Sequence, residues 1–186
     1  QKSAGGFIWA MVDEAVVRTD LNGGLDANGL NANDGILGPH REKEGSFYAL
    51  REIFSPIKLI PVRANSSFDG VTPGDHAGRG FYVENRFHFL NTNQCSFYWA
   101  LVDFSKPFDR FDGYIVKQKG TIVSPDIAPT KEGPLNLSLP ADYKNYDALV
   151  LVARDNFGKE IYKWTILIKN NQQLISNFVA VKNDST

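Results

Sequence analysis

The sequence predicts a mainly β protein whose second half is an antiparallel β-sandwich. From Phe81 onward, apolar and polar residues alternate with a period of two, as in FYVENRFHFL. Short turn signals such as NTNQ and NFGK separate the alternating runs. Six or seven short strands follow one another in this way, which is typical of an immunoglobulin-like sandwich.

The residues before this region predict a strand, a loop and a helix. GGFIWAMVD, Gly5–Asp13, is a continuous apolar run between glycines and an acid, as in a short buried strand. Residues 22–35 are rich in Gly and Asn, which predicts a loop. Residues 42–54 predict a helix that ends before Pro56, with one apolar face formed by Phe47, Leu50, Ile53 and Phe54.

The remaining elements follow in order. A strand at 57–63 carries Pro61, which belongs at a sheet edge or bulge. The loop at 65–80 is the expected boundary between two domains, residues 1–64 and 65–186. The expected sandwich strands are 81–90, 95–104, 113–123, 133–140, 147–155, 160–168 and a final short strand at 174–181.

The alternation also predicts the core of the sandwich, with Trp99 packed between the two sheets. The expected core residues are Phe87, Phe89, Phe97, Trp99, Leu151, Trp164 and Ile166.

Composition excludes several classes of function. A net charge of −1 gives no electrostatic reason to expect nucleic acid or an anionic membrane as partner. The single cysteine, Cys95, cannot form an internal disulfide. No apolar run approaches the roughly 18 residues of a membrane span. The start of the sequence has neither a signal peptide nor an initiator Met, so we expect a piece of a longer protein.

The residues alone predict no catalytic group. Asp13 and Glu14 are adjacent on the expected strand, so they point to opposite faces and cannot flank one glycosidic bond. The three histidines have no metal-ligand spacing, and the loop at 22–35 fails the EF-hand pattern. Trp9 fits either a sugar platform or a buried core position, and the sequence leaves both open.

Two stretches together, GGFIWAMVDEAVVRTD and NDGILGPHREKEGSFYALREIFSPI, resemble glycoside hydrolase family 2, and more narrowly its β-galactosidase-like members. In that family a Gly-Phe-(Ile/Val)-Trp run is the last strand of a (β/α)8 catalytic barrel. A turn, a helix and a β-sandwich domain follow it. The resemblance therefore implies an immunoglobulin-like sandwich preceded by a remnant of such a barrel, comprising strand, loop and helix.

The resemblance also implies roles for single residues. Trp9 matches the tryptophan that lines the sugar subsite, and Asp34 and Asn31 match ligands of a monovalent cation. Ala10 and Met11 replace the Asp and Trp that are usual in the family. Both catalytic glutamates of the family would lie upstream of Gly5, so this chain has no catalytic residue and is expected to be inactive alone.

The implied function is that of the C-terminal portion of an enzyme that hydrolyses β-galactosides in carbohydrate metabolism. Its partner is carbohydrate, its only implied cofactor is the monovalent cation, and the resemblance favours a bacterial, periplasmic or extracellular location. The alternative is a free-standing sandwich that binds carbohydrate or protein, for which Tyr98, Tyr114 and Phe108 would form an exposed aromatic platform. We also expect self-association through the exposed barrel remnant.

Overall fold

The computed structural model describes residues 5–27, 34–61, 81–106 and 109–179. The chain forms two compact units, Gln1–Phe54 and Ser55–Thr186. The expected boundary between residues 64 and 65 lies outside the described residues. The strand before it, β3 (Ile57–Pro61), belongs to the second unit, because it pairs there with β4 (Phe81–Asn85).

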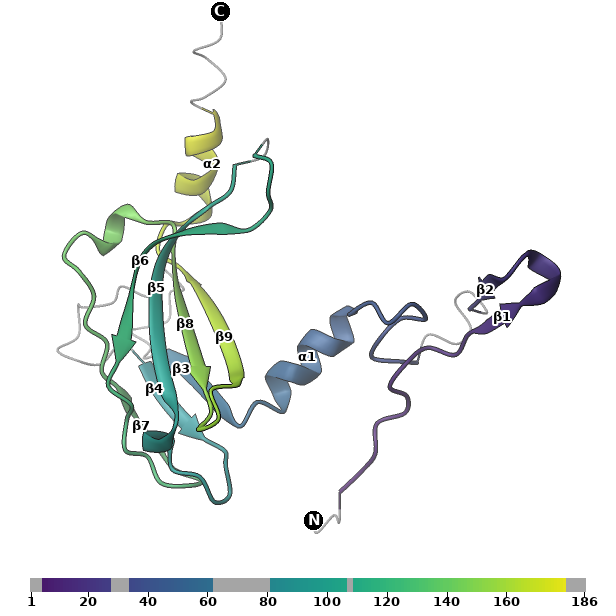
Figure 1. The fold of residues 1–186 in the computed structure, drawn as a ribbon. Coiled ribbons are helices and arrows are strands. Elements are labelled where there is room, and N and C mark those ends of the chain that lie inside the picture. Colours follow the sequence, from purple (N-terminus) through teal and green to yellow (C-terminus); the bar gives the residue numbers. More distant parts are fainter. Residues whose placement is uncertain (1–4, 28–33, 62–80, 107–108, 180–186) are drawn as a thin grey trace, which may run out of the picture. The chain divides into compact units, whose positions relative to one another are not determined.

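The second unit is an antiparallel β-sandwich, which confirms the predicted fold class (Figure 1). One sheet has the order β3-β4-β7, with β7 at Glu132–Leu135. The other has the order β6-β5-β8-β9. Its strands are Tyr114–Ile122, Ser96–Phe104, Ala148–Arg154 and Glu160–Leu167. Short 3-10 turns lie at Thr92–Gln94 (η3) and Tyr143–Asn145 (η4). Pro61 ends β3, an edge strand among the described strands, as expected.

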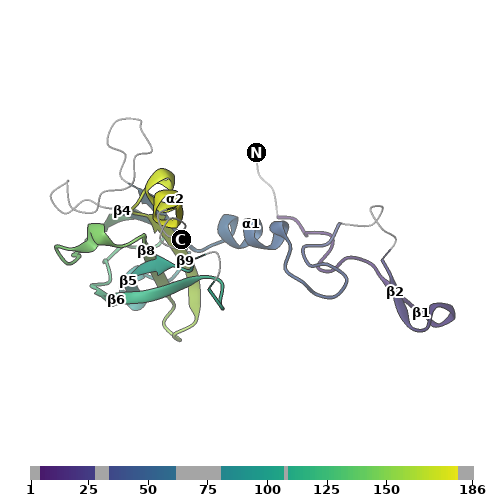
Figure 2. The same cartoon turned by 90° about the horizontal axis from the view of Figure 1, so that it is seen from above.

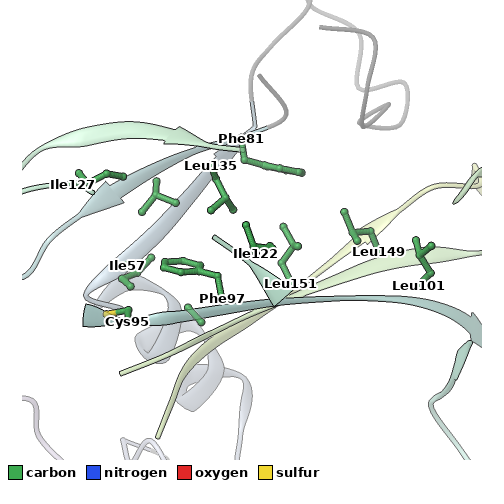
Figure 3. Close-up of a cluster of buried hydrophobic side chains, with 12 residues drawn as sticks. Ile57, Phe81, Cys95, Phe97, Leu101, Ile122, Ile127, Leu135, Leu149 and Leu151 are labelled. Carbon is green, nitrogen blue, oxygen red and sulfur yellow. The ribbon is translucent and has the colours of Figure 1, made fainter. Parts of the chain in front are cut away.

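The main core lies between the two sheets, where Figure 3 shows side chains from both sheets meeting. Period-two alternation produces it: along β4 the buried positions are Phe81, Val83 and Asn85. The buried cluster is Ile57, Phe81, Val83, Cys95, Phe97, Leu101, Ile122, Ile127, Leu135, Leu149, Leu151 and Ala153.

Six of the seven expected core residues contribute to this core. Phe97 and Leu151 are buried, and Phe87, Trp99, Trp164 and Ile166 are half-buried against it. The prediction for Phe89 is wrong, because its side chain is 96% exposed. The reason is that β4 ends at Asn85, so the alternation stops before it reaches Phe89.

Asn85 forms the corner that ends β4. Its buried amide nitrogen donates to the carbonyls of Leu90 and Ile127, each at 2.9 Å. Its side-chain oxygen accepts from the backbone N–H of Phe87 at 3.0 Å. These bonds hold residues 85–90 in a turn, and they satisfy a polar group with no access to water.

A second, smaller cluster lies on the outer face of the four-stranded sheet. Val102, Ala148 and Val150 are buried there, although they alternate with residues of the main core. Tyr114 and Phe104 are among the half-buried side chains packed against them. The Lys163 ammonium lies 5.5 Å from the centroid of the Tyr114 ring.

The prediction of a final strand at 174–181 is wrong within the described residues, because Asn171–Val179 form a helix, α2. Asn170 and Gln173 explain its start. The Asn170 side chain accepts from the N–H of Gln173, and the Gln173 side chain accepts from the N–H of Asn170, both at 2.9 Å. This reciprocal pair is a capping box built from amide side chains.

The first unit differs from its prediction in two places (Figure 2). Gly5–Asp13 is not a regular strand, and only Val12 makes an isolated parallel bridge, to Leu37. The loop expected at 22–35 contains a strand: β2 (Gly24–Asp26) pairs with β1 (Val16–Arg18) across a 3-10 turn, η1 (Thr19–Leu21). Asn22 and Gly23 have positive φ angles, which closes this hairpin.

The helix expected at 42–54 is present as α1, Gly45–Ile53. None of its residues is buried. Phe47 and Leu50 are half-buried, whereas Ile53 and Phe54 are exposed on the predicted apolar face. Neither helix among the described residues has the length and apolar character needed to cross a membrane.

Candidate functional site

Trp9 lies in an extended segment with large apolar side chains open to solvent. Its own side chain is 78% exposed, and Phe7 and Met11 are exposed on either side. The Trp9–Ala10 peptide bond is cis. The sequence left open whether Trp9 is a sugar platform or a buried core residue. Within this unit, its side chain is not buried.

The segment after Trp9 pairs with the turn that contains Asp34. The Ala10 N–H donates to the Asp34 carbonyl at 3.0 Å, and the Ala10 carbonyl accepts from Ile36 at 3.1 Å. Two further bonds continue the pairing, from Leu37 N–H to Met11 and from Asp13 N–H to Leu37. Main-chain pairing thus brings the segments of Trp9 and Asp34 side by side.

Asp13 fixes the end of this pairing. Its side chain is only 5% exposed, and its Oδ1 accepts from the Gly35 N–H at 2.7 Å. Glu14, by contrast, is exposed. The two acids therefore differ in their surroundings, with Asp13 buried and Glu14 open to solvent.

The implied cation ligands are placed only in part. Asp34 is exposed, and its main-chain carbonyl is used by Ala10. Asn31 lies outside the described residues. Among the residues that the structure describes, no group of three or more His, Cys, Asp and Glu side chains gathers as a metal site would require.

The β1–β2 hairpin carries a charged group that the sequence argument missed. The Arg18 guanidinium contacts Asp20 at 2.5 Å and Asp26 at 2.8 Å. The hydrogen bond with Asp20, followed by that with Asp26, raises the pKa of Arg18, and Arg18 in turn lowers the pKa of Asp20. The only signal in the sequence was an Arg followed closely by two acids in a turn-rich stretch.

The sandwich unit has an open groove of about 500 Å³. Its lining residues come from 123–128, 131–134 and position 136, and none of them is aromatic. A sugar ring would therefore find no stacking surface there.

Fold and site together define a mainly β protein, in which an antiparallel sandwich follows a segment that pairs Ala10–Asp13 with Asp34–Leu37. No protein-family model matches the sequence, and no curated protein matches it. Among solved structures, the chain is similar to the exo-chitosanase CsxA of Amycolatopsis orientalis, with a TM-score of 0.39 and 12% sequence identity. The similarity covers 73% of this chain and 14% of the exo-chitosanase chain.

Proposed function

We propose that this chain is the C-terminal portion of a β-galactosidase-like enzyme of glycoside hydrolase family 2. The observation that carries the proposal is the hydrogen bond from Ala10 to Asp34 beside an exposed Trp9. The sequence resemblance assigns Trp9 to the sugar and Asp34 to a cation next to it. The main-chain pairing supports that assignment, because both roles require the two residues to be neighbours.

In this function the chain binds and orients the substrate. Trp9 offers an uncovered indole face, on which the apolar face of a sugar ring can stack. The exposed Asp34 carboxylate is the group that would hold a monovalent cation, which supplies an anchor for sugar hydroxyls when bound. Acid and nucleophile chemistry in such enzymes needs two carboxylates about 5 Å apart, and the resemblance assigns both to segments upstream of Gly5.

The exposed apolar surface of the first unit supports a partner of the kind that a barrel would provide. Phe7, Ile8 and Met11 are exposed in the Trp9 segment. In the same unit, Tyr48 and Ile53 are exposed on α1. Strand and helix of a (β/α)8 barrel bury such side chains against the neighbouring strands and helices.

The replacement of two family residues bears on the substrate. Ala10 and Met11 stand where the family usually has Asp and Trp, directly after the sugar tryptophan. The Asp→Ala difference removes a carboxylate from the residue that directly follows the implied sugar tryptophan. We therefore propose a β-galactoside-like terminal sugar that makes fewer polar contacts at this edge of the pocket.

The alternative of a free-standing binding module has less support. Tyr98 is exposed, but Tyr114 is half-buried against Val102, Ala148 and Val150. These two side chains therefore do not make one flat exposed platform. Phe108 lies outside the described residues.

The test begins with the coding sequence upstream of Gln1. We expect an in-frame barrel with two catalytic glutamates, and we call the protein that includes it the extended enzyme. It should release nitrophenol from an aryl β-galactoside, and Trp9→Ala should lower kcat/KM by roughly 100-fold through lost sugar stacking. Phe157→Ala, which truncates an exposed ring in the sandwich unit, is the matched control and should leave kcat/KM unchanged.

The 186-residue chain alone should show no turnover above buffer at high protein concentration. Turnover that copurifies with this chain and disappears in Glu14→Gln would contradict the proposal. So would an upstream region that encodes no barrel.

A further inference from the structure

We propose that Asp13 is a positioning residue of the sugar site, which keeps the Trp9 segment and the Asp34 turn in register. This inference rests on the proposed function, because it assigns Asp13 a role in the site that Trp9 and Asp34 form. Asp13 touches neither sugar nor cation in this proposal, and it acts through the main chain of Gly35.

The first observation is the burial and aim of the Asp13 carboxylate. It is 5% exposed, and its Oδ1 lies 2.7 Å from the Gly35 nitrogen. A carboxylate accepting from a main-chain N–H makes a stronger hydrogen bond than a neutral acceptor does. Since Gly35 directly follows Asp34, this bond restrains the residue next to the implied cation ligand.

The second observation is that Asp13 is held at both ends. Its backbone N–H donates to the Leu37 carbonyl at 2.9 Å, while its side chain holds Gly35. One residue therefore contacts the 34–37 turn at two points two positions apart. A slip of the turn along the Trp9 segment would break both bonds together.

The third observation is the close approach at Gly35. A Cβ added there would overlap the backbone of Val12 and Asp13, and it would lie 2.7 Å from Asp13 Oδ1. The turn thus packs against the Trp9 segment with no room for a side chain. Gly35→Ala is accordingly a second way to disturb the same register without altering Asp13.

The consequence for the site follows from the Ala10–Asp34 bond. That bond, at 3.0 Å, places Asp34 beside the residue that follows Trp9. Without the Asp13 carboxylate, the Gly35 N–H loses its partner and the turn is held by main-chain bonds alone. The separation between the indole of Trp9 and the carboxylate of Asp34 would then vary, and both are needed to bind one sugar.

The structural part of the test uses the 186-residue chain and amide hydrogen exchange followed by NMR. In Asp13→Val, exchange at Ala10, Ile36 and Leu37 should accelerate about tenfold or more, because the local opening becomes easier. Asp13→Asn keeps an acceptor for Gly35 and should restore exchange to within about threefold of the original chain. Glu14→Gln, at the exposed neighbour, should change nothing, and amides of β8 report that the sandwich is still folded.

The functional part uses the extended enzyme. Asp13→Val and Gly35→Ala should each raise KM for an aryl β-galactoside about tenfold and leave kcat within about threefold, because binding geometry is lost and the acid and nucleophile are untouched. Asp13→Asn should recover most of the original KM.

The possible failures are distinguishable. Unchanged exchange at Ala10 and Leu37 in Asp13→Val overturns the positioning role, whatever the activity. Faster exchange with an unchanged KM also overturns it, because Asp13 would then serve local structure only. If the unaltered extended enzyme hydrolyses no β-galactoside, the proposed function fails, while the exchange result still measures the register.

Discussion

The indole ring of Trp99 occupies the space in which a side chain at Gly120 would stand. The two residues face each other across β5 and β6. A Cβ added at Gly120 would lie 2.7 Å from both Nε1 and Cε2 of the indole. The position of this tryptophan thus depends on a glycine in the neighbouring strand.

Gly120→Ala should therefore destabilise the sandwich by about 1–3 kcal/mol, because the rigid indole must move out of a packed position. Urea unfolding followed by circular dichroism measures the loss. Gly45→Ala, at the first residue of α1 with open space around it, is the control and should not lower stability. A loss at Gly120 within about 0.5 kcal/mol of zero would mean that Trp99 has another position available.

The Asp147 carboxylate joins three strand ends, which predicts an asymmetry between two variants. Its two oxygens accept from Lys169 Nζ at 2.7 Å and from the Phe104 N–H at 2.9 Å. Asp147→Ala should cost about 2–3 kcal/mol, since it leaves a sheltered N–H and an ammonium without their acceptor. Lys169→Ala should cost less, roughly 1 kcal/mol, because the carboxylate keeps Phe104.

A double-mutant cycle of Asp147→Ala and Lys169→Ala, read by thermal unfolding, isolates the ion pair. The coupling should shrink in high salt, because both side chains retain some access to solvent. Equal losses for the two single variants would contradict the asymmetry.

Cys95 should react slowly with thiol reagents in the folded chain. Its side chain is buried, and this burial, aided by the negative charge of Asp155, raises the pKa of the thiol. At pH 8 the native thiol is protonated and shielded, so reaction with a chromogenic disulfide should follow unfolding. Complete reaction within seconds, without denaturant, would show that the thiol is accessible.

The raised pKa of Cys95 also predicts how the free energy of unfolding changes with pH. A raised pKa in the folded state means that the unfolded thiol ionises first, so the stabilisation is present below the ordinary thiol pKa of 9.0 and is lost as pH rises above it. Urea midpoints measured from pH 8 upward should therefore fall more steeply for the original chain than for Cys95→Ala. Parallel curves for the two proteins would contradict this.

The 186-residue chain should self-associate through its first unit. Phe7, Trp9 and Met11 are exposed together on one extended segment, and exposed apolar side chains gathered in this way favour contact with another chain. Light scattering should show a concentration-dependent mass that the triple variant Phe7→Ser, Trp9→Ser and Met11→Ser abolishes.

The control for self-association is Phe89→Ser with Phe157→Ser, which removes two exposed rings from the sandwich unit. This variant should associate as the original chain does. If the original chain is monomeric at tens of micromolar, the prediction is wrong. If the control variant is monomeric, the chains associate through the sandwich unit instead.

The sandwich could be predicted from the sequence because its strands are bounded by turns and follow one period. In β5, Phe97 and Trp99 were expected in the core; Phe97 is buried in the main core, and Trp99 is half-buried against it. The core prediction failed at Phe89, because the Asn85 side chain ends β4 before it. Nothing in the alternation of FYVENRFHFL reveals that Asn85 turns the chain, since its partners Leu90 and Ile127 become visible only in three dimensions.

Two other differences have local causes that compete with hydrophobic pattern. The apolar run LISNFVAV suggested a strand, but the Asn170–Gln173 cap starts a helix before it. The Gly-rich stretch at 22–35 predicted only a loop, yet Val16 pairs with Asp26 and Val17 with Leu25 around two residues of positive φ. In both places a polar side chain or a turn residue outweighed the apolar period.

Only the family resemblance allowed residues of the candidate site to be predicted from the sequence. Trp9 and Asp34 were named from matching motifs, whereas the contact between their segments depends on main-chain bonds. Asp13 was recognised as a non-catalytic acid because of its neighbour Glu14. Its bond to Gly35, 22 positions away, is a tertiary contact with no periodic signature.

The hydrogen bond from Asn85 to Ile127 also has a bearing on how the chain is synthesised. The two residues are 42 positions apart, and β7, which pairs with β4, lies further on still. On the ribosome, β4 emerges well before either partner, and contacts of such separation form slowly. The nascent chain therefore carries an open edge on β4 until β7 has left the exit tunnel. Codon changes that slow translation between β5 and β7 should lengthen that interval and increase capture by chaperones.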